Sequence, residues 1–243
     1  MTTNADLFLP RGYRENPPLP VDVEGGRYWA DPEETRARNR RRYQDAVYRI
    51  AARRTRGKVA VDVGCGTGQN LVRRIAPVAR RAVGVDQPSA ISLARTSYPA
   101  NEWIAADLAS DAVWAELQTV TPDVVVCADV IEHVGDPRQL LGRLHRLVGS
   151  AGVLVLSTPD RDRTEDQPEL GPPRNPRHVR EWAFPEMGRL LEACGFTVRS
   201  THHVLPRRYP PTWLEAKMLA WRALHLRPIP GRRSCMVFEA TVA

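Results

Sequence analysis

Lysine is almost missing from this sequence of 243 residues. Only Lys58 and Lys217 are lysines, and the other 33 of the 35 basic residues are arginines. The formal net charge is +7 and the pI is near 9.7. A nucleic-acid-binding face needs basic residues that are clustered and interleaved with aromatics, but the densest basic run, residues 36–44, fits the solvated face of a helix. We therefore expect no nucleic acid partner, and an RNA-associated cofactor-binding module is kept as an alternative.

Paired cysteines and long apolar runs are missing as well. The four cysteines lie far apart and form no C-x-x-C pair, which argues against a structural zinc site or a disulfide framework. No spacing among the six histidines demands a metal ion, so no metal is expected. No apolar run approaches the roughly 20 residues of a membrane span, and residues 1–18 lack the features of a signal peptide. These absences predict a cytoplasmic protein without a membrane span.

The length suits one domain with an additional N-terminal segment. Residues 1–30 contain four prolines and three glycines, so this stretch should form an irregular arm laid over a surface. Residues 32–54 begin with proline and carboxylates and end with arginines, the pattern of a helix whose charges suit its dipole. We expect an arm and helix over residues 1–56 and the main domain over residues 57–243.

Short β-branched runs alternate with helix-compatible segments from residue 58 onward. Strands that are apolar throughout are typical of a parallel sheet with helices on both faces, so the fold class is α/β and doubly wound. Two later strands, over residues 197–204 and 235–243, need not be parallel, and a helix over residues 184–194 should end at Gly195. The five earlier strands are expected over residues 58–63, 81–86, 102–107, 123–129 and 152–158.

An insertion at about residues 205–230 lies between the two late strands. Its apolar residues recur at three- and four-residue spacings between residues 210 and 230, which predicts an amphipathic helix. Such a face usually packs on a sheet or on a second subunit, which would give a homodimer. A lid over an acceptor pocket and an interfacial membrane helix are the alternatives, and the lid is preferred between these two.

The stretch "VDVGCGTGQN", residues 61–70, contains the end of the first strand and the turn after it. The glycines of this turn, at 64, 66 and 68, let a ligand approach backbone N–H groups. Gln69 occupies the third glycine position of the dinucleotide fingerprint, which argues against an NAD-dependent oxidoreductase. Asp62 stands two residues before Gly64. A ligand with an ammonium group would explain this carboxylate, either by contact or through ordering of the loop.

Two further carboxylates end the next two strands. Asp86 lies 18 residues after Gly68, where it can accept hydrogen bonds from a ribose diol. Asp107 can accept a hydrogen bond from the exocyclic amine of adenine, with Leu108 against the ring. Each signal alone is weak, because a strand-end aspartate is often an ordinary cap. Their order on successive strands predicts a ligand with an amino acid, ribose and adenine, which is S-adenosylmethionine.

The sequence resembles the class I S-adenosylmethionine-dependent methyltransferases over residues 58–200 or so. Its segment "DVVVCADVIEHVGDP" is similar to the subgroup that includes ubiquinone-biosynthesis, small-molecule and sugar O-methyltransferases. The resemblance implies a Rossmann-like sheet of seven strands, mostly parallel with one antiparallel strand near the C-terminus. It also implies that Asp129 lines the cofactor and that the E-H-V triplet at 132–134 faces the active cleft. The expected cofactor-binding residues are Asp62, Gly64, Cys65, Gly66, Gly68, Asp86, Gln87, Asp107, Leu108 and Asp129.

Two histidines are candidate catalytic bases. A hydroxyl acceptor must lose its proton, and a neutral imidazole suits that task. His133 follows the fourth strand, and His178 lies in a long proline-rich loop whose "HVREW" run is similar to methyltransferases of saccharide gene clusters. Either histidine could instead serve its local structure, by packing on a helix or bonding the backbone of its loop. The expected function is O-methylation of a saccharide or similar polar small molecule, with N-methylation of an amino sugar as the nearest alternative.

Overall fold

The computed structural model describes most of the chain. The helix expected over residues 210–230, with its proposed roles, lies outside the described residues except for three single positions, and so does the beginning of the helix expected over residues 32–54. The described residues are 3–18, 43–164, 167–204, 213, 217, 220 and 235–243.

A seven-stranded sheet forms the centre of the described chain, in the order β3-β2-β1-β4-β5-β7-β6. The strands from β3 to β5 are all parallel, whereas β7 runs antiparallel to both of its neighbours. This confirms the expected Rossmann-like sheet with a single antiparallel strand near the C-terminus. The strands are β1 (Val59–Val63), β2 (Arg81–Asp86), β3 (Glu102–Ala105), β4 (Val124–Ala128), β5 (Val153–Pro159), β6 (Phe196–Val204) and β7 (Cys235–Val242).

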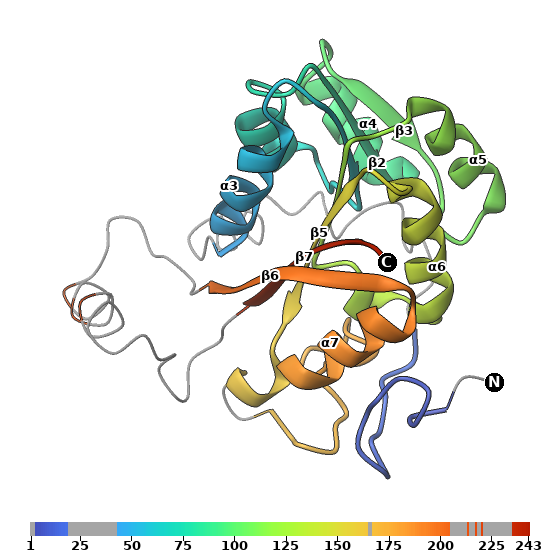
Figure 1. Ribbon diagram of the computed structural model, residues 1–243, viewed down its shortest axis with the longest axis vertical. Coiled ribbons are helices and arrows are strands. Elements are labelled where there is room, and N and C mark those ends of the chain that lie inside the picture. Colours follow the sequence, from blue (N-terminus) through green and yellow to red (C-terminus); the bar gives the residue numbers. More distant parts are fainter. Residues whose placement is uncertain are drawn as a thin grey trace.

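Helices cover both faces of this sheet (Figure 1). Side chains of α3, α4 and η2 pack in one buried cluster, and side chains of α5, α6 and α7 pack in the other. Two separate cores are what a doubly wound sheet requires, because each strand must bury both of its faces. The helices are α3 (Tyr43–Thr55), η2 (Leu71–Ile75), α4 (Pro88–Ser97), α5 (Asp111–Val120), η3 (Ile131–His133), α6 (Pro137–Val148), η4 (Arg161–Arg163) and α7 (Phe184–Ala193).

Strand β1 shows how the sequence pattern builds the two layers. Val59, Val61 and Val63 join the cluster under α5, α6 and α7, while Ala60 joins the cluster under α3. Successive side chains of a strand point to opposite faces, so an apolar residue is needed at nearly every position. Asp62 is the exception, with 1% of its surface exposed.

The segment after the glycine turn differs from a regular α-helix. Residues Leu71–Ile75 form a π-helix, in which the Ala76 N–H donates to the Leu71 carbonyl oxygen at 2.9 Å. Leu71 and Ile75 are fully buried against the α3 side of the sheet. Short π-helical turns often occur at functional sites, because they place one extra residue in the turn.

Helix α7 ends as the sequence predicts. Gly195 follows its C-cap with φ of +87°, and a Cβ at this position would lie 2.9 Å from the His145 ring. Only glycine adopts this left-handed conformation without cost, so the chain can leave the helix here and start β6.

The N-terminal arm, residues 3–18, lies beside α7, where Figure 1 shows it in blue. Leu7, Leu9 and Tyr13 are buried in the cluster under α5, α6 and α7. The arm also bonds to α6, since Arg138 donates to the Asp6 carbonyl oxygen at 2.7 Å. The described arm is therefore packed into the domain rather than laid loosely on it.

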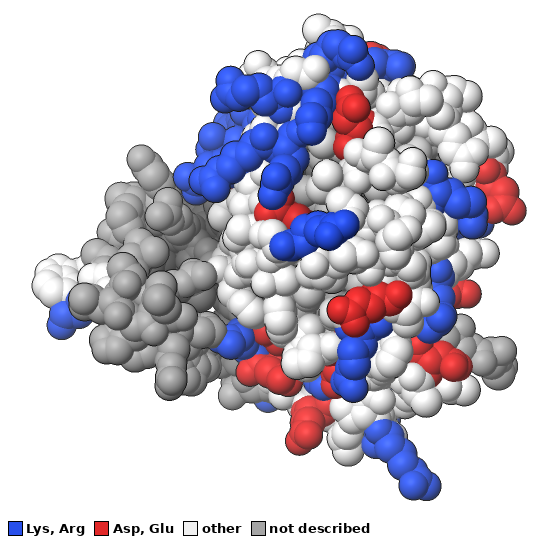
Figure 2. All heavy atoms as spheres, in the orientation of Figure 1, with Lys and Arg blue, Asp and Glu red and all other residues white. Residues whose placement is uncertain are grey.

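Basic side chains gather over the part of the surface where α3 lies (Figures 1 and 2). Several of them have acidic partners: Arg49 and Arg74 both pair with Asp45, at 3.1 and 2.5 Å, and Arg54 pairs with Glu239. Part of the positive charge of this face is therefore neutralised by the protein itself. Among the described helices, none has both the length and the apolar character of a membrane span.

Candidate active site

The carboxyl ends of β1, β2, β3 and β4 carry the acidic residues singled out in the sequence. Strand β1 lies between β2 and β4, so the connections from β1 and β4 leave the sheet in opposite directions. Ligands of doubly wound sheets bind at the carboxyl ends of the strands near such a switch point. The fold thus brings Asp62, Asp86, Asp107 and Asp129 to one edge of the sheet.

Asp62 points into the layer between β1 and α3. The Tyr48 hydroxyl donates to its two carboxyl oxygens, at 3.1 and 3.0 Å. Burial raises the pKa of Asp62 to about 7, the hydrogen bond from Tyr48 opposes this rise, and the charge of Asp86 adds to it. A carboxyl buried in this way holds the start of the glycine turn from the inside, which favours the loop-ordering role over direct ligand contact.

Two glycines of the turn are demanded by the protein's own packing. Gly64 has φ of +78°, and a Cβ there would lie 2.2 Å from the Val130 side chain. Gly68 has φ of +76°, and a Cβ there would lie 2.2 Å from the Trp103 ring. Side chains are therefore excluded at both positions by backbone conformation and by neighbouring residues, in addition to any ligand.

Asp86 ties the glycine turn to the second strand. Its Oδ2 accepts from the Gly66 N–H at 2.7 Å, and its Oδ1 accepts from the Gln87 N–H at 2.7 Å. An ionised carboxylate has about four acceptor positions. These two hydrogen bonds fix the carboxylate at the carboxyl end of β2, next to the glycine turn.

Asp107 and Leu108 form a tight turn after β3. The Ala109 N–H donates to Asp107 Oδ1 at 2.8 Å, so one carboxyl oxygen is used as a local cap. The Leu108 carbonyl oxygen accepts from Trp114 at 2.9 Å and from Arg143 at 2.6 Å. Trp114 and Arg143 therefore fix the backbone of this turn. Because Asp107 Oδ1 caps the turn, Asp107 Oδ2 is the oxygen suited to an exocyclic amine.

Asp129 has an unusual backbone conformation at the end of β4. Its φ is +56°, a left-handed conformation that is uncommon for residues other than glycine and recurs at functional sites. Its Oδ1 accepts from the Ser157 hydroxyl at 3.0 Å, and its Oδ2 accepts from the Gln44 amide at 3.0 Å. Gln44 in turn accepts from Asn70 at 3.2 Å, so α3 connects Asp129 to the glycine turn.

The Cys65 side chain, by contrast, points into the core. It is 6% exposed and a Cβ on Gly84 would lie 2.9 Å from its sulfur. Burial raises the pKa of the Cys65 thiol well above its usual value. The expected cofactor contact of Cys65 is thereby limited to its backbone.

His133 and His178 lie together although they are far apart in the sequence. Their ring centroids are 4.8 Å apart, with an interplanar angle of 84°. His133 Nδ1 lies 2.8 Å from the Arg177 carbonyl oxygen, and His178 Nδ1 lies 2.5 Å from Glu181 Oε1. Since both partners are acceptors, each Nδ1 donates a hydrogen bond to its partner.

Glu132 completes this cluster and was named in the sequence only as a neighbour of His133. It is 1% exposed, and its Oε2 accepts from the Thr158 hydroxyl at 2.9 Å. Its Oε1 is buried and has no hydrogen-bond partner among the described residues. Burial raises the pKa of Glu132 well above its usual value, and the charge of Asp129 raises it further.

The N-terminal arm holds the loop that carries His178. The Asn16 amide points at the carbonyl oxygens of three loop residues, including His178 at 3.0 Å. The Tyr13 hydroxyl accepts from the Glu181 N–H at 2.9 Å, and Glu15 pairs with Arg180 at 2.6 Å. No sequence pattern pointed to these contacts, because they join segments more than 150 residues apart.

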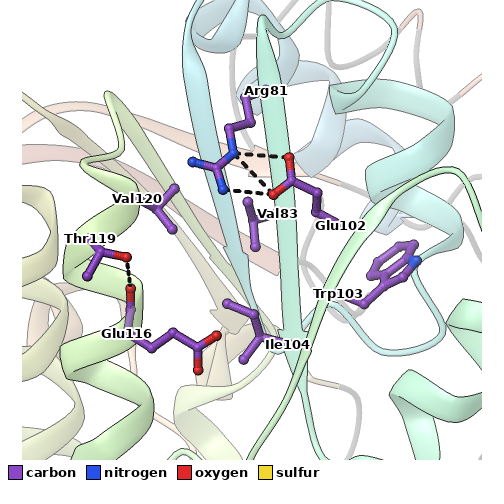
Figure 3. Close-up of a pocket in the computed structure, with 8 residues that line it drawn as sticks. All are labelled: Arg81, Val83, Glu102, Trp103, Ile104, Glu116, Thr119 and Val120. Carbon is purple, nitrogen blue, oxygen red and sulfur yellow. Dashed lines mark hydrogen bonds and ion pairs between the residues drawn. The ribbon is translucent and has the colours of Figure 1, made fainter.

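A hollow of about 380 Å³ lies elsewhere, where the first residues of β2 and β3 meet α5 (Figure 3). Arg81 and Glu102 both line this hollow, and their side chains form an ion pair at 2.8 Å. This is the amino edge of the sheet, opposite to the aspartates. The hollow is therefore separate from the candidate site.

The sequence comparisons agree with this geometry. A family model for a methyltransferase domain matches residues 35–201. A probable S-adenosylmethionine-dependent methyltransferase of Mycolicibacterium smegmatis is 35% identical over 161 residues, which are 66% of this chain and 60% of that protein. A relative of the same description from Mycobacterium tuberculosis is 36% identical over 157 residues, 64% of this chain and 54% of that protein. The chain thus spans 54–60% of the length of these relatives.

More distant relatives include the ubiquinone biosynthesis O-methyltransferase of Thiobacillus denitrificans, which is 33% identical over 108 residues, 44% of this chain and 46% of that protein. Among solved structures, an S-adenosylmethionine-dependent methyltransferase from Mesorhizobium loti has a TM-score of 0.58 at 17% identity and covers 82% of this chain and 99% of its own. At that identity the likeness shows the fold.

The strand ends fit the cofactor that this family uses. The Asp86 carboxylate accepts from the Gly66 N–H, which places it against the glycine turn, and Asp107 lies in the turn after β3. Carboxylates accept hydrogen bonds, so they suit the hydroxyl and amine groups of S-adenosylmethionine. With the family model matching most of its length, the chain belongs to the S-adenosylmethionine-dependent methyltransferases.

Proposed function

We propose that this methyltransferase transfers its methyl group to a hydroxyl of a saccharide or a similar polar small molecule. The observation that carries the proposal is the His133–His178 pair beside Asp129, at the edge of the sheet where the family binds its cofactor. Relatives named ubiquinone biosynthesis O-methyltransferases support an oxygen acceptor. The "HVREW" run around His178 supports an acceptor that carries hydroxyls.

The residues that hold the cofactor follow from the strand ends. When bound, S-adenosylmethionine supplies a methyl group on a positively charged sulfur. Asp86 and Gln87 would bind the ribose, Asp107 and Leu108 the adenine, and Asp129 would line the amino-acid end. The backbone of the glycine turn would approach the ligand most closely, at Gly64, Cys65, Gly66 and Gly68, with Asp62 ordering the turn from inside.

Transfer to oxygen requires that the acceptor lose a proton. The transfer would form an oxygen–carbon bond and break the carbon–sulfur bond, whose electron pair would stay on sulfur, while the hydroxyl proton would pass to His133 or His178. His133 and His178 are oriented for this activation, because Arg177 and Glu181 fix their Nδ1 atoms. A neutral imidazole near pH 7 is suited to assist removal of such a proton.

Acceptor choice should depend on the parts of the chain around His178. The arm fixes the loop of His178 through Asn16 and Tyr13. We propose that residues 1–56 and the insertion at about 205–230 add to a methyltransferase domain over residues 57–243.

The four cysteines are free thiols, which supports the proposed cytoplasmic location.

The test replaces both histidines. We expect H133A/H178A to bind S-adenosylhomocysteine as the wild type does, while turnover of a hydroxyl acceptor falls by about 10²–10⁴-fold. His202→Ala is the matched control, because His202 lies on β6 and pairs with Glu239 at 2.8 Å. Calorimetry gives the binding, and mass spectrometry of the acceptor gives the turnover. Full turnover of the hydroxyl acceptor in the double variant would show that neither histidine is its base. Activity on an amine acceptor that is insensitive to both replacements would favour N-methylation, because a neutral amine attacks without a base.

A further inference from the structure

We propose that Glu132, His133 and His178 form a binding site for a divalent transition-metal ion such as Zn²⁺. One ligand atom of each side chain lies within 4.8 Å of those of the other two. Two imidazoles and one carboxylate are a ligand set found in catalytic zinc sites, where a further position stays open for water or substrate. The sequence spacing did not predict this site, because His178 comes from a distant loop.

Each of the three ligands already has an outer partner. His133 donates to the Arg177 carbonyl oxygen at 2.8 Å, and His178 donates to Glu181 at 2.5 Å. The Thr158 hydroxyl donates to Glu132 Oε2 at 2.9 Å. Metal-binding histidines almost always donate their second ring nitrogen to a carboxylate or a carbonyl, and metal-binding carboxylates are hydrogen-bonded in turn. The cluster therefore has the outer shell of a metal site as well as its ligands.

The buried oxygen of Glu132 is an independent reason for a cation. Glu132 is 1% exposed, and its Oε1 has no hydrogen-bond partner among the described residues. Buried polar atoms are nearly always satisfied, so an exception in a folded protein calls for a cause. Glu181 Oε2 is a second buried oxygen without a described partner, directly behind His178. A cation bound between Glu132 and the two histidines would give Glu132 Oε1 a partner.

The ligand types favour a borderline metal ion over a hard one. Imidazole suits Zn²⁺ and related ions, whereas Mg²⁺ prefers oxygen ligands. Zinc–ligand bonds of about 2.0–2.2 Å hold ligand atoms at most about 4.4 Å apart. The three side chains would therefore draw slightly together around the ion.

The ion would also restrict which acceptors bind, an inference that rests on the proposed function. Glu132 and His133 follow Asp129 by three and four residues at the carboxyl end of β4, so a substrate on the ion would lie near the edge of the sheet that carries the aspartates. Acceptors with a hydroxyl and a neighbouring oxygen would bind best there. The histidines would then act on the hydroxyl through the ion, rather than as free bases.

The test measures Zn²⁺ binding to the full, untagged chain without cofactor or acceptor. After treatment with a chelator, the wild type should take up one Zn²⁺ per chain in calorimetry, and Mg²⁺ should bind far more weakly. His178→Ala and Glu132→Gln should weaken the site at least tenfold, and Glu181→Gln should weaken it roughly 10–100-fold through the loss of the outer partner. Circular dichroism verifies that each variant is folded.

His202→Ala is the control that should bind Zn²⁺ like the wild type, since its ring lies on β6. Equal affinity in His178→Ala and the wild type would place the ion elsewhere and overturn the proposal, and so would a wild type that takes up no Zn²⁺. Because these readings need neither methyl transfer nor S-adenosylmethionine, their failure is distinct from failure of the proposed function. A chain that binds Zn²⁺ here but transfers no methyl group would overturn only the latter.

Discussion

At the scale of single residues, Asp62 makes stability depend on pH. Its pKa is about 7 in the folded protein against 3.8 for an ordinary aspartate, because burial disfavours the charged form. The folded state therefore binds more protons than the unfolded state between about pH 4 and 7. The contribution of this group to stability is fully present below pH 4, and it is lost as the pH rises to about 7.

We expect Asp62→Asn to remove most of this dependence, because an amide fits the same space and does not titrate. From pH 4 to 7 the wild type should lose on the order of a few kcal/mol of unfolding free energy relative to the variant. Urea denaturation of both proteins at several pH values measures the difference. Curves that stay parallel from pH 4 to 7 would show that Asp62 titrates normally.

The sequence could place the acidic residues but not their partners. Asp86 was located correctly at the end of β2, and Asp107 lies two residues after the end of β3, because the apolar runs that fix strand length are local features of the chain. Tyr48 and Gln44 were missed, although they bind Asp62 and Asp129. Their roles depend on how α3 packs across the sheet, and no local pattern records that packing.

At the scale of elements, the sheet was the most predictable part of the molecule. Strands buried on both faces leave runs of β-branched residues, so β2 was predicted at its exact bounds, Arg81–Asp86, and the other strands within a few residues. The sequence indicates a helix-compatible segment after the glycine turn without specifying its type, and Leu71–Ile75 form a π-helix. A π-helix bonds each N–H to a carbonyl oxygen one residue further back than an α-helix does. The spacing of apolar residues over five positions does not distinguish the two.

The arm and the His178 loop act as one element, and Asn16 joins them. Its amide donates to loop carbonyl oxygens that would otherwise be half-buried without a partner, among them that of His178. We expect Asn16→Ala to lower the free energy of local opening by about 1 kcal/mol, which makes amide exchange of the loop roughly fivefold faster. Hydrogen exchange followed by mass spectrometry measures residues 172–182 directly.

Cofactor binding should be unaffected by this substitution, since Asn16 does not lie at the strand ends that carry Asp86 and Asp107. Acceptor turnover should fall, because His178 loses its fixed position. Asn101→Ala, at the start of β3 on the far side of the sheet, is the matched control. Unchanged exchange in the loop of Asn16→Ala would mean that Tyr13 and Glu15 hold the loop without Asn16.

At the scale of the whole molecule, one sheet contains both residues that the family model matches and residues outside the match. The family model ends at residue 201, yet β7 inserts between β5 and β6 and so completes the sheet. The arm lies outside the matched residues too, and it reaches the loop that carries His178. The residues that the family model matches therefore include the aspartates at the carboxyl edge of the sheet, while the arm outside them holds the loop of His178.

Cofactor binding should stabilise this whole structure, because the site is assembled from four strand ends that separate on unfolding. At a ligand concentration of 100 times Kd, the gain is about 2.7 kcal/mol, which for a chain of this size corresponds to a rise in Tm of about 5–10 °C. Asp86→Asn should keep the fold but lose most of that rise, since an amide cannot offer the same acceptors to a ribose diol.

The control for Asp86→Asn is Glu116→Gln, which lines the hollow on the opposite edge of the sheet (Figure 3). It should show the full rise in Tm with S-adenosylhomocysteine, measured by differential scanning fluorimetry. Loss of the rise in Glu116→Gln but not in Asp86→Asn would move the cofactor to the amino edge, against the switch-point rule for doubly wound sheets. Each substitution removes one negative charge, Asp86→Asn at the carboxyl edge of the sheet and Glu116→Gln near the amino edge. The pair of variants thus tests which edge of the sheet binds the ligand.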